Sequence, residues 1–171
     1  MAFEPSIYVV EQIGAGLLTI MARPVPEEWT DEMFAGLAEW GVHRIVLPHG
    51  PLLENESVSG DMEALCTRHG IQFLSFPMND RGVPSSLPDF RTCTHMLYET
   101  TGRGTNTVVY SRAGIGSEEL MVAGVLAHAG FEPKKAFRHI SKARGTAVQE
   151  GKEQRNWLVK HWREFLGLWP D

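Results

Sequence analysis

The hydrophobic pattern at the start of the chain predicts a pair of short strands. Apolar and β-branched residues dominate Ile7–Val10 and Leu17–Met21, and Gly14 and Gly16 separate the two runs. Short runs of this composition joined by a glycine-containing turn are typical of a β-hairpin. We therefore expect the chain to open with two paired strands.

Downstream of this hairpin, helical and strand-like patterns alternate. Thr30 is placed to cap a helix that ends near Trp40, with Gly41 just past its end. Further helices are predicted over about 61–70, 89–98, 120–130, 133–145 and 153–169, and further strands over 43–48, 71–75 and 106–110. The stretch 51–60 is expected to be a polar loop. This alternation predicts a single α/β domain over residues 1–171, with a mainly parallel central sheet flanked by helices on both faces.

Composition indicates a globular protein, and charge argues against some classes of partner. The chain has 171 residues, of which 43% are hydrophobic and 22% charged, and its net charge is −5. An acidic balance argues against a duplex nucleic acid partner and is mildly unfavourable for an anionic membrane. No signal-peptide pattern and no apolar run long enough to cross a bilayer is present. We expect a cytoplasmic protein that binds neither nucleic acid nor membrane.

The cysteines, histidines and tryptophans suggest structural roles. Cys66 and Cys93 lie in helix-like patterns and are expected to be buried, free thiols. The seven histidines show no metal-ligand spacing, so no metal and no cofactor is predicted. Helical spacing predicts a core-facing stripe on the last helix, composed of Leu158, Trp162, Phe165, Leu166 and Trp169.

The most informative stretch runs from a buried strand through a glycine-containing loop into a helix. The strand ends at Tyr110, and the loop delivers the chain into a first helical turn that contains Glu118 and Glu119. Backbone N–H groups and the helix dipole at such a junction suit an anion, whereas a plain strand-to-helix turn explains the same glycines equally well. The two carboxylates stand where an anion would otherwise bind.

The same stretch resembles a known family signature. VVYSRAGIGSEELMVAGVLAHAGFEPKKAFRHISKARG is similar to the signature region of cysteine-dependent protein tyrosine and dual-specificity phosphatases, whose loop reads H-C-x5-R-[ST]. IQFLSFPMNDRGVPS resembles the mobile acid loop of the family, with Asp80 at the general-acid position. ARGTAVQEGKEQRNWL resembles the late segment of small members, where Gln154 matches a glutamine near the active site. IYVV and MARP resemble the small bacterial-type versions, so the likeness spans nearly the whole chain.

This sequence departs from the family pattern at the positions that carry the chemistry. Tyr110 replaces the histidine, Ser111 the cysteine, Ser117 the arginine, and Glu118 the following serine or threonine. Six residues after Cys66 stands Gln72, and six after Cys93 stands Glu99, so no C-x5-R motif occurs elsewhere. The resemblance places the remaining phosphate-loop positions at Arg112, Ala113, Gly114, Ile115 and Gly116.

These replacements weaken both catalysis and phosphate binding. A serine hydroxyl at a helix start stays protonated, whereas the family reaction needs a thiolate. The missing guanidinium would supply charge-assisted hydrogen bonds of about 1.5–3 kcal/mol each. Glu118 adds repulsion of roughly 3 kcal/mol for unit charges about 6 Å apart at an effective dielectric near 20. The chain is therefore predicted to be a pseudophosphatase.

Several candidate residues have two interpretations. Asp80 is either a general acid or a turn residue of the NDRG segment. Arg112 either contacts an anion or pairs with a carboxylate such as Asp80 or Glu118. Gln154 either faces the pocket or caps the last helix. Arg144 is expected to be a cation at a helix end with no further purpose.

Three functions follow from the resemblance. The first is a catalytically inactive binding or scaffold module for a protein partner, possibly phosphorylated. The second is a hydrolase with residual or altered phosphoester activity that uses Ser111 or water with Asp80 as acid. The third is a regulatory partner of an active phosphatase or kinase. The sequence does not set an oligomeric state.

Overall fold

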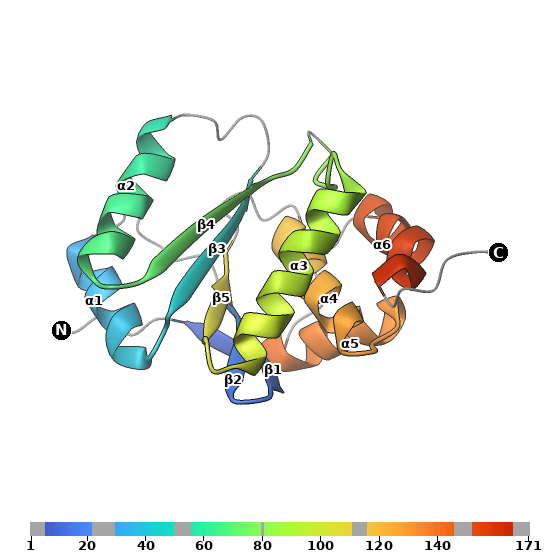
Figure 1. The fold of residues 1–171 in the computed structure, drawn as a ribbon, viewed down its shortest axis with the longest axis horizontal. Helices are drawn as coiled ribbons and strands as arrows, with labels where there is room; N and C mark the ends of the chain where they lie inside the picture. The colour runs from blue at the N-terminus through green and yellow to red at the C-terminus, as the bar shows by residue number, and fades with distance from the viewer. Residues whose placement is uncertain are drawn as a thin grey trace.

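The chain forms one five-stranded sheet in a computed structural model that describes residues 6–21, 30–49, 56–79, 81–110, 116–145 and 152–165. The strand order is β1-β2-β5-β3-β4 (Figure 1). The hairpin of β1 and β2 is antiparallel, and the other neighbouring pairs are parallel. The strands are β1 (Ile7–Ile13), β2 (Gly16–Met21), β3 (Arg44–His49), β4 (Gln72–Pro77) and β5 (Thr107–Val109).

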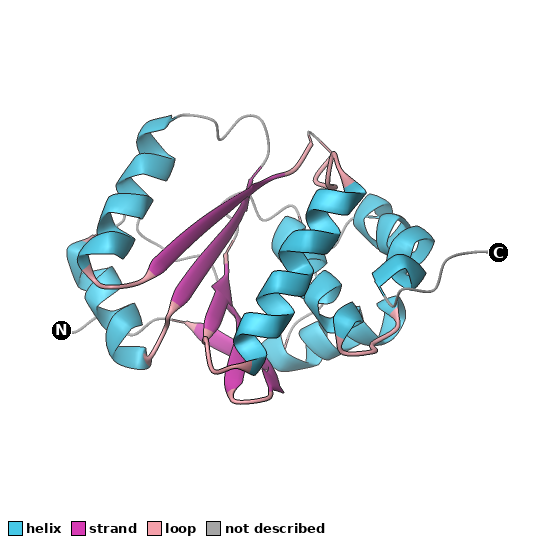
Figure 2. Cartoon of the chain, viewed as in Figure 1, coloured by secondary structure: helices cyan, strands magenta, loops and turns pink. Residues whose placement is uncertain are grey.

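Helices cover both faces of this sheet, which confirms the predicted α/β architecture (Figures 1 and 2). One face carries α1 (Asp31–Trp40) and α2 (Glu56–Arg68). The other face carries α3 (Leu87–Gly102), α4 (Ser117–His128), α5 (Pro133–Arg144) and α6 (Lys152–Phe165). α4 lies at the centre of this second layer and is buried on all sides from Ser117 to Ala127.

The predicted helix ends agree with the structure where a cap defines them. The Thr30 side chain accepts a hydrogen bond from the backbone N–H of Met33, and Gly41 closes α1 in the left-handed conformation at φ +106°. Gly145 closes α5 in the same conformation. Glycine adopts this backbone region without a Cβ penalty, so these ends are set locally.

Three helices are longer than predicted. α2 begins at Glu56, inside the stretch that we expected to be a loop. A glycine within a helix costs about 1 kcal/mol, which is too little for Gly60 to break it. α3 starts at Leu87, where the Ser86 hydroxyl accepts from the N–H of Asp89, and runs on to Gly102. α4 starts at Ser117 rather than at Leu120.

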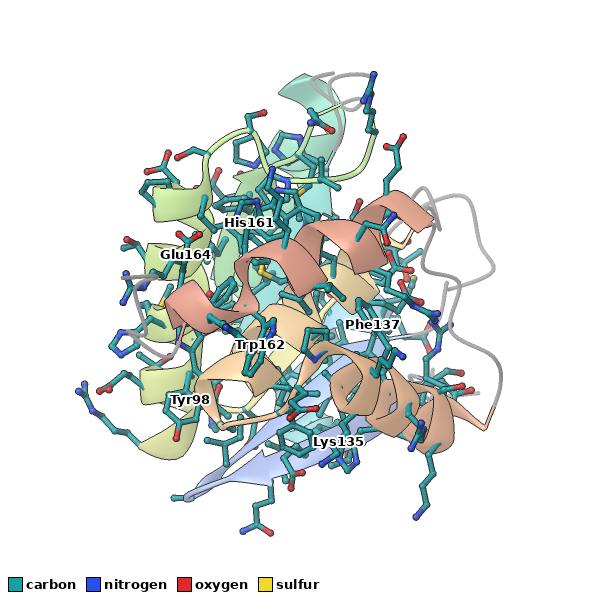
Figure 3. The ribbon with its side chains drawn as sticks, turned by 90° about the vertical axis from the view of Figure 1, so that its right-hand side faces the viewer. Tyr98, Lys135, Phe137, His161, Trp162 and Glu164 are labelled. Carbon is teal, nitrogen blue, oxygen red and sulfur yellow. The ribbon has the colours of Figure 1, made fainter. Side chains whose placement is uncertain are left out.

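The core residues confirm most of the structural roles assigned to tryptophan and cysteine positions. Leu158 and Phe165 of α6 are buried in the core, and the half-buried Trp162 packs against this core (Figure 3 labels Trp162). Leu166 and Trp169 lie outside the described residues. Cys66 is buried, Cys93 is half-buried, and both are free thiols. Within the described ranges, no helix is both long and apolar enough to cross a membrane.

Candidate functional site

The candidate site lies where β5 passes into α4, at the carboxyl end of the parallel strands. Tyr110 is buried, and its backbone N–H donates to the carbonyl of Val46 at 2.9 Å, so the chain leaves the sheet beside β3. Gly116 then begins α4 at φ +92°, a conformation that favours glycine. The loop residues Ser111, Arg112, Ala113, Gly114 and Ile115 lie outside the described residues.

The first turn of α4 buries three polar side chains. Ser117, at the family's arginine position, is 1% exposed, Glu118 is 7% exposed, and Glu119 is 0% exposed. Gly116 has no side chain, so it makes no side-chain cap for this helix end. The two carboxylates instead lie in the first turn, where the positive end of the helix dipole stabilises negative charge.

Glu119 has a specific partner that the sequence did not reveal. Arg144, at the end of α5, donates from Nη1 to Oε1 of Glu119, and its side chain is only 19% exposed. The expectation that Arg144 serves only as a helix-end cation is therefore wrong. A carboxylate with no exposed surface needs a cation or several donors, and Arg144 provides this compensation.

Gln154 connects α6 to the segment that resembles the acid loop. Its side chain is 3% exposed, and its Nε2 donates to the carbonyls of Arg81 at 3.0 Å and Gly82 at 3.4 Å. The alternative in which Gln154 caps the last helix does not match these contacts. The amide holds the chain just after Asp80, which itself lies outside the described residues.

The acid-loop segment forms a tight turn stabilised by Asn79. The Asn79 Oδ1 atom accepts hydrogen bonds from the backbone N–H groups of Arg81 at 2.9 Å and Val83 at 3.2 Å. Such side-chain acceptance is typical of an Asx turn. The NDRG pattern offers Asp80 as a turn residue in one of its two interpretations, whereas the turn acceptor in the structure is Asn79, a residue type equally favoured in turns.

The site therefore gathers three segments that are far apart in the sequence. The end of β5, the first turn of α4 and the loop after β4 lie at the carboxyl end of the parallel strands, and α6 holds the loop through Gln154. Ligands of open α/β sheets bind at this carboxyl edge of the strands. Among the described residues the edge presents carboxylates at the start of α4 and no ionised thiol.

The two cysteines do not supply a nucleophile. Burial raises the pKa of Cys66 to about 12 and that of Cys93 to about 11, so both thiols are protonated at neutral pH. They belong to α2 and α3 and not to the loop before α4. Within the part of the chain that the structure describes, no group of three or more histidine, cysteine or acidic side chains is placed to hold a metal ion.

Comparisons with known proteins relate the fold to a class of enzymes. No protein-family model matches the chain, and no curated protein matches it by sequence. The crystal structure of PTPMT1 is similar over 94% of this chain and 96% of its own, with a TM-score of 0.71 and 18% identity.

Two further structures extend this similarity. Kinase associated phosphatase (KAP), crystallised with its catalytic-site cysteine substituted by serine, aligns over 99% of both chains with a TM-score of 0.75 and 18% identity. Human DUSP28 aligns over 97% of this chain and 98% of its own, with a TM-score of 0.61 and 17% identity. The chain thus has the fold of the protein tyrosine and dual-specificity phosphatases.

Proposed function

We propose that this protein is a phosphatase-fold binding module that recognises a protein partner without cleaving phosphoesters. The observation that carries the proposal is the first turn of α4. A buried serine and two buried carboxylates, Ser117, Glu118 and Glu119, occupy the turn that follows the phosphate loop in the resembled family. A phosphate dianion at this helix start would meet negative charge in place of a guanidinium.

The missing arginine and the added carboxylate both weaken phosphate binding. Losing the guanidinium removes charge-assisted hydrogen bonds of about 1.5–3 kcal/mol each, and Ser117 replaces them with at most a neutral one. Together with the repulsion from Glu118, the loss is on the order of 5 kcal/mol, which corresponds to more than a thousandfold in affinity. Arg144 does not offset it, because that side chain is already bound to Glu119.

The chain also offers no thiolate for the family reaction. Ser111 stands at the nucleophile position, and both cysteines are protonated residues of helices elsewhere. Replacing cysteine by serine alone would leave the phosphate-binding arginine in place. Here the histidine, arginine and following hydroxyl positions differ as well, which favours loss of the whole catalytic function.

One observation favours residual hydrolysis as a second candidate. Gln154 binds the carbonyls of Arg81 and Gly82, which follow Asp80 in the sequence, so this described part of the segment that resembles the acid loop is held by α6. With Asp80 as acid, Ser111 or a water molecule would be the attacking group. The two candidates differ in whether any product forms and whether Ser111 is needed for it.

The test is a calorimetric titration of the unmodified protein with phosphotyrosine and with tungstate, beside a phosphotyrosine-peptide turnover assay. We expect no binding and no turnover. The triple variant Ser111→Cys, Ser117→Arg, Glu118→Ser serves as the positive control and should bind tungstate at least about a thousandfold more tightly. Turnover by the unmodified protein that Ser111→Ala abolishes would establish the hydrolase. Micromolar tungstate binding by the unmodified protein would contradict the proposal that Glu118 and Glu119 prevent anion binding at the start of α4.

A further inference from the structure

The strand β4 forms an edge of the sheet that no described strand pairs with. It bonds only to β3 on its inner side (Figure 1). The backbone N–H groups of Gln72 and Met78 donate inward, to the carbonyls of His43 at 2.9 Å and His49 at 2.7 Å. Because backbone groups alternate direction along a parallel strand, Phe73 and Ser75 direct their N–H and C=O groups outward. These outward groups are able to pair with an added strand.

A cavity of about 520 Å³ lies along this edge. β4 divides it into two walls, because successive side chains of a strand point to opposite faces of the sheet. The wall on the α3 side includes Arg44, Leu74 and Met96, and the wall on the α2 side includes Glu63, Thr67 and Phe73. An extended chain bound to the edge would therefore place alternate side chains against different walls.

Arg44 is a cation on the α3-side wall that neutral side chains hold in place. Its Nε and Nη2 donate to Oε1 of Gln72 at 3.2 and 2.8 Å, and its Nη1 donates to Oγ1 of Thr100 at 2.7 Å. All of these acceptors are neutral, and Arg44 forms no ion pair with a carboxylate of the described residues. Burial lowers the pKa of Arg44, although the guanidinium stays charged. A planar guanidinium held in place in this way is preorganised to bind a carboxylate.

Glu63 provides the opposite charge on the α2-side wall. It is an exposed residue of α2 and forms no ion pair with a basic side chain of the described residues. Among the described residues, each of the two walls thus carries one charge that has no ion-pair partner, and the two charges are of opposite sign. A strand that satisfies both must carry an acidic and a basic side chain at neighbouring positions, because neighbours face opposite walls.

We propose that the β4 edge binds an extended segment of a partner protein as an additional strand, with an acidic side chain toward Arg44 and an adjacent basic side chain toward Glu63. The outward groups of Phe73 and Ser75 supply main-chain hydrogen bonds, and the two walls supply specificity. The site lies apart from the start of α4. Binding at the β4 edge does not depend on the proposed loss of phosphate binding and catalysis at the start of α4.

The test selects heptapeptides from a random phage-displayed library on the immobilised full-length protein. Fluorescence anisotropy then measures the affinity of the enriched peptide. We expect enrichment of sequences with an acidic residue next to a basic one. Arg44→Gln should weaken binding at least about tenfold, because it removes a charge-assisted contact. Glu63→Gln should weaken it less, since Glu63 is exposed. Arg103→Gln, which removes an exposed cation from the end of α3, should leave it unchanged.

Ser75→Pro tests the main-chain contribution separately. Its N–H points away from β3, so proline removes the hydrogen bond to an added strand and leaves the sheet intact, which circular dichroism would verify. Selection that yields no enriched sequence, or peptides that bind Arg44→Gln or Ser75→Pro as tightly as the unmodified protein, would overturn the proposal. So would sedimentation showing a dimer of this chain that Ser75→Pro dissociates, because the edge would then pair with a second copy. The Ser111→Cys, Ser117→Arg, Glu118→Ser variant should bind the peptide normally, so the two proposals fail independently.

Discussion

Glu119 is a carboxylate whose side chain has no exposed surface, and its charge is compensated within the protein by Arg144. In an anion-binding loop the positive potential of the helix start would be left for a ligand. Here the first turn of α4 already carries Glu118 and Glu119, and a cation from α5 neutralises the more deeply buried one. The pair stabilises a helix start that has no side-chain cap, and it commits the Arg144 guanidinium to Glu119 instead of to a phosphate.

Removing Arg144 should lower the free energy of unfolding more than neutralising Glu119. Arg144→Met strands a buried carboxylate, and we expect it to lower the free energy of unfolding by about 3–5 kcal/mol. Glu119→Gln keeps an acceptor for Arg144 and should cost only about 1–2 kcal/mol. Urea denaturation of both variants and of the double variant measures the coupling. If the two single effects simply add in the double variant, the ion pair contributes no interaction energy of its own.

At the residue scale, the sequence identified the unusual positions but not their partners. Glu118 follows directly from the mismatch with the H-C-x5-R-[ST] pattern, and Glu119 follows from its place in the first turn of the predicted helix. Arg144 lies 25 residues away on another helix, and no local pattern links it to Glu119. Likewise, Gln154 was a candidate by resemblance, but its donation to the carbonyls of Arg81 and Gly82 depends on how α6 docks against the loop.

At the element scale, α4 depends on a glycine that lets α3 approach closely. A Cβ atom added to Gly124 would lie 2.8 Å from the Phe90 ring. That ring has little freedom to move, because it packs edge-on against the rings of Phe76, Trp157 and Phe165, with centroids 5.1–5.8 Å apart. The packing of α3, α4 and α6 therefore converges on one small residue.

Gly124→Ala should destabilise the protein although alanine is the better helix former. The gain in helix propensity is about 1 kcal/mol, whereas overpacking of a tight core costs about 1–3 kcal/mol. We expect a net loss, measured as a lower thermal midpoint. Gly102→Ala is the matched control, because a Cβ atom there meets only Ile13, at an ordinary distance of 3.8 Å. A thermal midpoint for Gly124→Ala equal to or above that of Gly102→Ala would show that the Phe90 ring moves aside without loss of stability.

Elements were predictable where local chemistry defines them. The hairpin and the ends of α1 and α5 rest on a turn, a threonine cap and left-handed glycines, all within a few residues. The start of α2 was missed because its serines and Gly60 are equally typical of a loop, and local propensity is too weak to decide. The order of the strands, with β5 between β2 and β3, depends on tertiary packing that periodicity does not encode.

At the scale of the whole molecule, charge is strongly segregated. Nine of the sixteen lysine and arginine residues, but only three of the twenty-one acidic residues, fall within residues 133–165. These residues include α5 and α6, which form one side of the molecule (Figure 3). Among the described side chains of this range, the exposed cations are Lys134, Lys135, Arg138, Lys142, Arg155, Lys160 and Arg163. The α5–α6 side is therefore basic although the net charge of the chain is −5. The local charge, and not the net charge, determines which molecules this side attracts.

This segregation predicts behaviour opposite to that of an ordinary acidic protein. At pH 7 and an ionic strength of about 0.01 M, where the Debye length is about 30 Å, we expect a cation-exchange resin to retain the protein through α5 and α6. The triple variant Lys135→Gln, Arg138→Gln, Lys142→Gln should lose this retention. A second triple variant, Arg68→Gln, Arg91→Gln, Arg103→Gln, lowers the net charge by the same three units and should still be retained, because α2 and α3 carry those side chains. Equal loss in both variants would show that net charge, and not the α5–α6 surface, governs the interaction.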